Sequence, residues 1–395
     1  MAPARVAIVH DCLDIYGDPE RILDGLHHIY PHAPIYTAQV HPDFGARSGD
    51  RARTWDIRPL RPWGYGNRHT SPVYTSRPSR QFAQPWTDLA LPLLWESLDL
   101  QDYDLVISST WGGLAHGVRV GAHTLHVCYC HQPDRRRWDP TLPPERWPWN
   151  RIAQLVMRPY DFYAAQRVDR WVTTSHRVAR RVERAYGRSP EVIAPPVKLQ
   201  GQGQAGERYY LYIGPLDRAA HVDLLIEACN QLKRPLQIVG TGPEEETLRA
   251  LAGETVEFLG VRSQADLLED HVYANAMALI VPGLAVDFHF GAVEALGRGL
   301  PVIGFEGAGL AEVVLHYRTG LLFKEPTVAS LGETIEEFER LRFFSQACID
   351  RAEEFAETVF ASKFDWYVAQ ALDEFQARSG IQPPATAMSR REAEG

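Results

Sequence analysis

The residues from 286 to 303 carry the clearest potential for binding chemistry, with the sequence Val-Asp-Phe-His-Phe-Gly-Ala-Val-Glu-Ala-Leu-Gly-Arg-Gly-Leu-Pro-Val-Ile. Gly291 frees the backbone at a turn, and residues 292–296 are expected to form a helix that begins beside it. A helix N-terminus presents unpaired N–H groups and a partial positive charge, which suit a phosphate. Glu294 lies one turn further on and could hold the hydroxyl pair of a ribose. The alternative is an ordinary loop–helix–strand unit.

A second candidate is His131, which comes just after a buried apolar run at residues 124–129. That run is expected to be a strand of a parallel sheet. Ligands of such sheets bind beyond the carboxyl ends of the strands. The position of His131 therefore predicts that its side chain faces a ligand cleft.

Strands and helices alternate along the whole chain, which predicts an α/β fold. In the first half the expected strands are residues 5–10, 33–37, 104–109, 124–129, 170–174 and 191–193. After a polar, glycine-rich stretch, further strands are expected at residues 209–213, 235–239, 256–259, 278–281 and 301–304. Two doubly wound parallel sheets, each Rossmann-like, follow from this pattern.

The predicted domains are residues 1–196 and 208–360, joined by a flexible linker at 197–207. Residues 361–378 are expected to form a helix that packs back on the first domain, and residues 379–395 a disordered tail. Two such domains would place a cleft between the carboxyl edges of their sheets.

The distribution of charge excludes one class of partner. The 395-residue chain has a net charge of -9, but residues 1–195 hold 24 arginines and no lysine against 20 acidic residues. That half is mildly basic and the other half is acidic. A binder of duplex nucleic acid needs a concentrated basic face, so nucleic acid is not an expected partner.

The five cysteines are scattered and lack the spacing of a metal site. Cys128 and Cys130 are too close along one strand for ordinary disulfide geometry, which favours free thiols in a reducing cytoplasm. We expect neither a signal peptide, because the first strand begins by Arg5, nor a spanning helix, because no apolar run approaches ~20 residues. The prediction is a cytoplasmic protein, with peripheral contact at the inner face of a membrane as a further hypothesis.

At the level of motifs, the chain resembles the retaining glycosyltransferases of family 4, which have the GT-B fold, and within them the mannosyltransferase branch of bacterial surface-polysaccharide assembly. In the first half the resemblance rests on residues 9–11, 16–17, 19–21, 103–109, 128–133 and 138–139. In the second half it rests on residues 212–214, 222–224, 239–244, 258–260, 287–288, 293–295 and 319–323.

The resemblance implies that a nucleotide sugar, linked to GDP or UDP, sits on the second domain and that an acceptor approaches over the first, without a metal. Five positions depart from the family pattern. Two of them, His289 and Asp18, stand where the family has a glycine. The arginine and lysine that normally stabilise the departing diphosphate are replaced by Pro215 and Ala220. Of the family's two glutamates, the first is replaced by Val286, and Glu294 keeps the second.

The resemblance also implies the site residues. Those expected at the sugar donor are Asp287, Phe290, Gly291, Glu294, Gly214, Arg218, His221, Gly240, Gly242 and Gly260. The catalytic candidates are His131, His289 and Arg135, and those beside the acceptor are Tyr16, Gly17 and Asp18. Arg218, His221, His289 and Arg135 could supply the charge that the replaced residues no longer give. The alternative for His289 and for residues 135–137 is a solvated loop without a ligand.

Three other features have simpler explanations. Residues 102–104, Asp-Tyr-Asp, match the metal motif of other glycosyltransferases but precede their strand, at the wrong end of the sheet. Residues 240–246 lack the third glycine of a dinucleotide site, and their glutamates would repel a pyrophosphate. Residues 55–95, with Trp63, Tyr65 and Trp86, could dock a membrane-linked acceptor or could cap the core of the first domain.

The predicted function is transfer of a hexose, for which mannose is a candidate, from a nucleotide-diphosphate sugar to a glycan or lipid-linked acceptor with retention. In this reaction the acceptor proton would pass to the departing phosphate oxygen. The alternative is a catalytically silent protein of the same fold that binds nucleotide or a partner enzyme. The sequence sets no oligomeric state.

Overall fold

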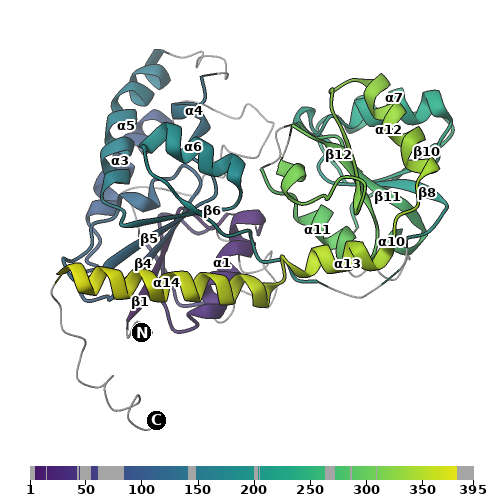
Figure 1. The fold of residues 1–395 in the computed structure, drawn as a ribbon. Coiled ribbons are helices and arrows are strands. Elements are labelled where there is room, and N and C mark those ends of the chain that lie inside the picture. The colour runs from purple at the N-terminus through teal and green to yellow at the C-terminus, as the bar shows by residue number, and fades with distance from the viewer. Residues whose placement is uncertain are drawn as a thin grey trace, which may run out of the picture. The chain divides into compact units, whose positions relative to one another are not determined.

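The computed structural model of the chain describes residues 5–14, 16–41, 44, 55–60, 84–140, 148–199, 203, 205–262, 272–284, 287–307 and 309–379. They form two compact units (Figure 1). Unit 1 comprises residues up to 194 and those from 360 onward, and unit 2 comprises residues 195–359. Val286, Trp63, Tyr65 and the tail from 380 lie outside the described residues.

Unit 1 is built on a parallel sheet of seven strands in the order β3-β2-β1-β4-β5-β6-β7. The strands are β1 (Val6–His10), β2 (Ile35–Thr37), β3 (Ile57–Pro59), β4 (Leu105–Thr110), β5 (Leu125–Cys130), β6 (Arg170–Thr173) and β7 (Glu191–Val192). Its helices are α1 (Asp18–Ile29), α3 (Gln84–Glu96), η2 (Ala115–Gly117), α4 (Arg135–Trp138), α5 (Pro148–Gln166), α6 (His176–Tyr186) and α14 (Glu357–Ser379). Every residue of β4 and β5 is buried, as expected at the centre of a parallel sheet covered on both faces.

The carboxyl ends of β1, β4 and β5 lie side by side in unit 1. His10 pairs in register with Ser109, and Thr110 pairs with Cys130. Residues just past these strand ends therefore meet at one edge of the sheet.

Helix α14 returns the end of the chain to unit 1. The rings of Phe360 and Phe364 lie 6.1 and 6.3 Å from the ring of Tyr129 in β5. Arg170 in β6 pairs with Glu374 further along the helix. Phe364 is fully buried, so the core of unit 1 includes residues that follow unit 2 in the sequence.

Unit 2 is built on a parallel sheet of six strands in the order β10-β9-β8-β11-β12-β13. The strands are β8 (Tyr209–Ile213), β9 (Leu236–Val239), β10 (Val256–Gly260), β11 (Ala276–Val281), β12 (Val302–Phe305) and β13 (Gly320–Phe323). Its helices are η3 (Arg218–Ala220), α7 (Val222–Leu232), α8 (Glu245–Leu251), α10 (Val272–Asn275), α11 (Phe290–Gly297), η4 (Gly309–Glu312), α12 (Val328–Arg340) and α13 (Ser345–Glu353). Helices α7 and α12 pack together over an apolar cluster that contains Leu225, Ile238 and Phe338.

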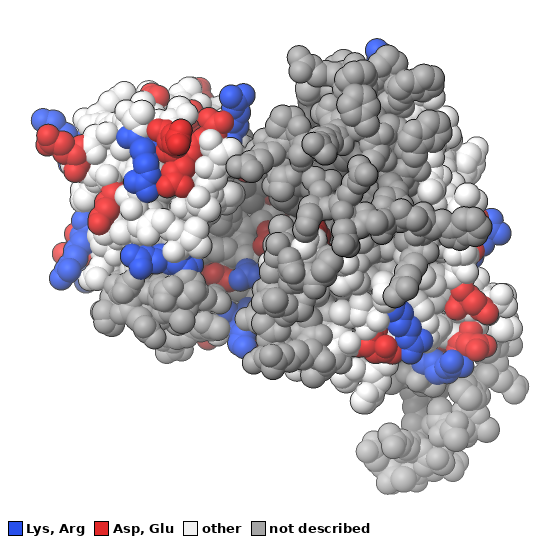
Figure 2. Space-filling view, turned by 180° about the vertical axis from the view of Figure 1, so that it is seen from behind, with Lys and Arg blue, Asp and Glu red and all other residues white. Residues whose placement is uncertain are grey.

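The described surface in Figure 2 shows acidic and basic side chains interspersed over white surface rather than gathered by sign. Ion pairs of unit 2 include Arg234 with Glu339 and Arg249 with Glu245. In the described part of the chain, no helix is both long enough and apolar enough to cross a membrane.

The predicted fold class is confirmed, because both sheets are parallel and flanked by helices. Several boundaries differ from the prediction. The helix expected at residues 292–296 is α11, which begins two residues earlier. Strands β3 and β13 were not predicted, since each is a run of at most four residues without alternation.

Candidate functional site

A chain of buried polar side chains lies at the carboxyl edge of the sheet in unit 1. His131 Nε2 is 2.8 Å from Ser109 Oγ, and the same hydroxyl is 3.0 Å from His10 Nδ1. His10 Nε2 in turn lies 3.7 Å from Glu20 Oε1 in α1. The ring of Trp111 lies 4.7 Å from His10 and 5.8 Å from His131. His131, placed at a ligand edge by its sequence position, is thus tied to two neighbouring strands.

These hydrogen bonds restrict where the protons of Ser109, His10 and His131 can lie. A hydroxyl has one proton, so Ser109 can donate to only one of the two imidazole rings, and the other ring must present an N–H to it. Burial, with the nearby His10 ring, lowers the pKa of His131 well below its usual value. His131 is therefore neutral near pH 7, and its ring can donate or accept but carries no charge.

Asp11 follows β1 and is the most heavily hydrogen-bonded carboxylate at this edge. It accepts bonds from the Thr110 hydroxyl and from the backbone N–H groups of Trp111, Gly113 and Ala115, at distances between 2.7 and 3.2 Å. A Cβ at Gly113 would lie 2.6 Å from Asp11 Cγ, so only glycine fits there. Asp11 fixes the loop after β4, and with it the surroundings of His131.

The predicted acceptor-side residues lie at the start of α1. The Gly17 N–H donates to Glu20 Oε2 at 2.9 Å, and Asp18 is the first residue of the helix. Tyr16 OH donates to Asp24 at 3.3 Å. Because Glu20 also lies beside His10, one carboxylate connects this loop to the polar chain that ends at His131. Contact of these residues with an acceptor stays a prediction.

Arg135 begins the short helix α4, four residues after His131. Its guanidinium donates to Asp139 at 3.0 and 3.1 Å. Arg137 is buried, with Nη2 3.4 Å from Asp134 and Nη1 3.7 Å from the buried Asp161. Residues 135–137 therefore belong to a short helix rather than to a solvated loop, and Arg137 anchors this helix in the core of unit 1. Contact of Arg135 with a ligand stays a prediction.

The loop expected to bind phosphate leads into α11 of unit 2. His289 is the N-cap of this helix, and its Nδ1 accepts a hydrogen bond from the Ala292 N–H at 2.9 Å. A Cβ at Gly291 would lie 3.1 Å from the His289 ring, so glycine leaves room for the cap. The N–H groups of Phe290 and Gly291 open the helix, where the helix dipole favours a negative charge.

His289 does not provide the positive charge that was expected of it. Burial lowers the pKa of His289 to about 4, so the ring is neutral near pH 7. Since Nδ1 accepts the capping bond, the ring proton lies on Nε2. His289 offers a neutral N–H donor beside the helix N-terminus instead of a cation.

The other residues predicted in this loop lie around the same helix. Phe290 stacks edge-on against Phe288 at 5.1 Å between centroids. A Cβ on Gly309 would lie 2.1 Å from the carbonyl oxygen of Asp287, so Asp287 packs against the backbone of η4. Glu294 lies one turn inside α11 and is partly exposed. Its position fits the predicted contact with a ribose, which stays a prediction.

The predicted glycines hold three loops together at the carboxyl edge of the sheet in unit 2. A Cβ on Gly240, whose φ is +145°, would lie 1.9 Å from Gly214 O, and one on Gly242 would lie 2.2 Å from Leu216 O. Gly240 N–H donates to Gly260 O at 2.9 Å. The loops after β8 and β9 and the end of β10 thus approach one another closely through backbone atoms. This packing accounts for Gly240 and Gly242 before any ligand is considered.

The positions that depart from the family pattern follow β8. Pro215 is exposed, and its carbonyl oxygen accepts a bond from Tyr212 OH at 2.8 Å. Ala220 ends η3, where its N–H donates to Asp217 at 3.0 Å. Arg218 is 90% exposed and lies 3.2 Å from Glu244, which offsets its charge. His221 has a left-handed backbone, with φ +51°, at the start of α7.

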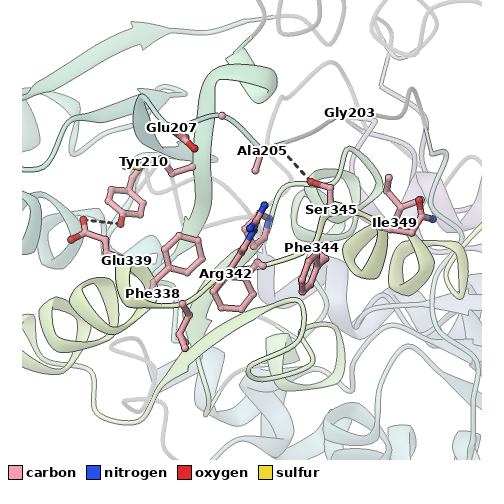
Figure 3. A pocket seen from close by; sticks show the side chains of 16 residues that line it. Gly203, Ala205, Glu207, Tyr210, Phe338, Glu339, Arg342, Phe344, Ser345 and Ile349 are labelled. Carbon is pink, nitrogen blue, oxygen red and sulfur yellow. Dashed lines mark hydrogen bonds between the residues drawn. The ribbon is translucent and has the colours of Figure 1, made fainter.

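A pocket of about 1180 Å³ in unit 2 lies away from these loops (Figure 3). Its lining includes Tyr210 and Met277 near the amino ends of β8 and β11, with Phe338, Arg342 and Phe344. Ligands of parallel sheets bind at the carboxyl edge, so this pocket is on the wrong edge for the sugar donor.

Comparisons with known proteins agree with this arrangement. A family model described as Glycosyltransferase Family 4 matches residues 46–200, and one described as Glycosyl transferases group 1 matches residues 199–355. The chain belongs to the family 4 glycosyltransferases. Solved structures similar to this chain include the lipopolysaccharide outer core galactosyltransferase WaaB, with a TM-score of 0.67 and 12% identity over 93% of this chain and 99% of that one. Anabaena HepE in complex with UDP has a TM-score of 0.65 and 15% identity over 93% and 100%.

The names of two proteins with similar sequences specify different sugar donors. The GtfA subunit of the UDP-N-acetylglucosamine–peptide N-acetylglucosaminyltransferase of Streptococcus parasanguinis is 26% identical over 63% of this chain and 51% of its own length. The GDP-mannose-dependent alpha-mannosyltransferase of Mycobacterium tuberculosis is 28% identical over 54% of this chain and 56% of its own. The chain spans about half the length of these relatives.

Sequence reasoning missed four residues of the site in unit 1. His10, Asp11, Glu20 and Ser109 belong to the segments that carried the family resemblance, yet none was assigned a role. The sequence does contain a pattern that could have identified these four residues. Polar residues at the carboxyl ends of three apolar runs, at residues 10–11, 109–110 and 131, indicate side chains that meet at one edge of a sheet.

Proposed function

We propose that this chain transfers a hexose from a nucleotide-diphosphate sugar to a glycan or lipid-linked acceptor, with retention at the anomeric carbon. The observation that carries the proposal is the loop and helix in unit 2. There the N-terminus of α11, the neutral N–H donor of His289 and Glu294 one turn inside occur together. A diphosphate at the helix N-terminus and a ribose near Glu294 fit this arrangement.

The reaction breaks the bond between the anomeric carbon and the diphosphate oxygen and forms a bond from that carbon to an acceptor hydroxyl oxygen on the same face. The acceptor proton passes to the departing phosphate oxygen, so no protein base is required. The proposed role of His289 and the helix N-terminus is to stabilise the developing charge on the diphosphate. In this proposal His131 orients the acceptor hydroxyl.

The identity of the sugar is a finer proposal. Relatives name GDP-mannose and UDP-N-acetylglucosamine as donors. We take GDP-mannose as the first donor to test because the motifs resemble the mannosyltransferase branch. Arg218 and Arg135 remain proposed sources of cationic charge, since Pro215 and Ala220 provide none.

The test measures nucleotide binding and turnover separately on the full chain. Calorimetry with GDP and UDP reports binding, and release of nucleotide from GDP-mannose, UDP-glucose and UDP-N-acetylglucosamine reports transfer or slow hydrolysis. Glu294→Gln is expected to weaken nucleotide binding at least tenfold, while Glu333→Gln, at an exposed glutamate of α12 in the same unit, leaves it unchanged.

The outcomes separate the two hypotheses. Turnover of any donor in the panel supports the enzyme. Binding of nucleotide without turnover of any donor would support the silent nucleotide-binding protein instead. If neither GDP nor UDP binds, the assignment of the loop and of Glu294 to the donor is wrong.

A further inference from the structure

Helix α5 of unit 1 presents an apolar face to solvent. Ile152, Leu155, Val156, Pro159 and Tyr163 are all exposed and follow the i, i+3, i+4, i+7 spacing of one side of a helix. Leu155 is 72% exposed and Tyr163 is 67% exposed. We call these five residues the α5 apolar face.

The opposite side of the same helix is anchored in the core. Ala153, Met157, Asp161 and Ala164 are buried, so α5 has a fixed rotation and its outer residues cannot turn inward. Helix α3 packs beside α5 and adds Leu93, which is 76% exposed (Figure 1). A contiguous exposed apolar surface of this kind marks an interaction site.

The charges around the α5 apolar face are basic. Arg151 and Arg158 are exposed on the same helix. Among the described side chains of α3 and α5, the two carboxylates are not available at the surface to offset them. Glu96 pairs with Arg119 and Arg167, and Asp161 is fully buried. An apolar helix face with two exposed arginines, and with no exposed carboxylate among the described side chains of these two helices, complements an anionic lipid surface.

The α5 apolar face also adjoins the segment that carries the candidate catalytic residues. The guanidinium of Arg158 lies over the ring of Trp138 at 4.6 Å from the centroid. Trp138 ends α4, the helix that begins at Arg135 shortly after His131. A surface bound to α5 would therefore lie against the helix that follows His131.

We propose that the α5 apolar face docks unit 1 on an anionic membrane. The inference deepens the proposed function, on which it rests for one point only: the acceptor is then the lipid-linked one, presented at the bilayer. Docking itself needs neither sugar donor nor acceptor. Most of the predicted contact at residues 55–95 falls outside the described residues, and of that segment only Leu93 enters this proposal.

The experiment measures co-sedimentation of the full chain with vesicles of phosphatidylcholine and phosphatidylglycerol, and with vesicles of phosphatidylcholine alone. The expected result is binding to the anionic vesicles that weakens with salt. Leu155→Glu should lower the partition coefficient at least tenfold. Phe344→Glu is the matched control, because Phe344 in unit 2 is 66% exposed and should tolerate the same change without an effect on binding. Arg151→Ala should weaken binding about fivefold at low salt.

Two results would overturn the proposal. One is the absence of binding to anionic vesicles by the unaltered chain, or binding that Leu155→Glu does not reduce. The other is a dimer, seen by light scattering without vesicles, that Leu155→Glu dissociates, since the face would then join two copies of the chain. Calorimetry with GDP and UDP runs in parallel on each variant, so that failure of the donor site is recognised separately. Thermal melting confirms that each variant is folded.

Discussion

The imidazole of His289 performs two tasks that require the same protonation state. Nδ1 must be unprotonated to accept the Ala292 N–H, and Nε2 must carry the proton to serve as a donor toward a ligand. Protonation would remove the cap, and burial already disfavours it. The neutral ring is therefore part of the helix start and, in the proposed function, part of the phosphate site.

Substitutions at residue 289 should separate these two tasks. His289→Ala is expected to lower the free energy of unfolding by about 1 kcal/mol, because the N-cap is lost. His289→Asp keeps a capping oxygen and hence most of the stability, but its charge should weaken GDP or UDP binding at least tenfold. Denaturant unfolding and calorimetry measure the two effects. Equal nucleotide affinity in His289→Asp and the unaltered chain would rule out a phosphate near this residue.

The stability of the chain should fall in mild acid through His289. The pKa of His289 is lowered to about 4 in the folded state from 6.5, so between these values the unfolded state binds more protons. The stabilisation is complete above pH 6.5 and is lost as the pH falls toward 4. Compared with His289→Asn, the unaltered chain should lose roughly 2 kcal/mol more between pH 7 and 4.5. Urea unfolding at several pH values tests this, and parallel curves for the two proteins would contradict it.

Ser109 should act as a positioning residue for His131. Ser109→Ala removes the hydroxyl that connects His131 to His10, and transfer is expected to fall at least tenfold in kcat with nucleotide binding unchanged. Ser108→Ala is the matched control. It removes the 2.9 Å contact between Ser108, which precedes Ser109 in β4, and His126 in β5. Both variants should lose about 1–2 kcal/mol of stability. An equal loss of kcat in the two would show that the effect is structural.

At the residue level the sequence predicted the positions of site residues better than their protonation states and hydrogen bonds. Strand ends predicted that His131 faces a ligand edge and that Glu294 lies one turn into a helix, because both follow from local pattern. The protonation of His289 could not be predicted, since it depends on burial that only the tertiary fold creates. The bonds to Asp11 come from residues about 100 positions away and leave no local trace.

At the scale of elements, the loops after β8 and β9 depend on glycine for their mutual contact. Gly240→Ala would place a Cβ 1.9 Å from Gly214 O, at a φ of +145°. The variant is expected to lose more than about 3 kcal/mol of stability in unit 2. Gly187→Ala is the control, because Gly187 has φ +65° but open space around its Cα and should cost about 1 kcal/mol. Thermal unfolding compares them, and similar costs would mean that φ rather than the close approach sets the requirement for glycine.

Most elements could be predicted because long periodic segments carry their own signal. The starts of helices were less certain. Helix α11 begins at Phe290 because the His289 ring caps it, and histidine is not among the common capping residues. The short strand β13 is defined by its pairing with β12, a long-range contact that four apolar residues cannot specify alone.

At the scale of the whole molecule, the chain leaves unit 1 near residue 194 and returns to it near residue 360. The returning helix supplies core residues, so its loss should affect unit 1 first. Phe364→Ala is expected to destabilise unit 1 by about 3–5 kcal/mol. Trp366→Ala, two residues along the same helix but 67% exposed, should change stability by less than about 0.5 kcal/mol. Denaturant unfolding followed by hydrogen exchange assigns the loss to a unit, and equal effects of the two variants would contradict the packing of α14.

This path of the chain sets an order of events on the ribosome. Unit 2 is contiguous in the sequence and can fold as soon as it has left the exit tunnel. Unit 1 cannot complete its core until α14 has been translated. Until then the side of the sheet around Tyr129, which Phe360 and Phe364 later cover, has no partner from α14. A released chain that ends at residue 359 should therefore be cut by protease in unit 1 and remain resistant in unit 2.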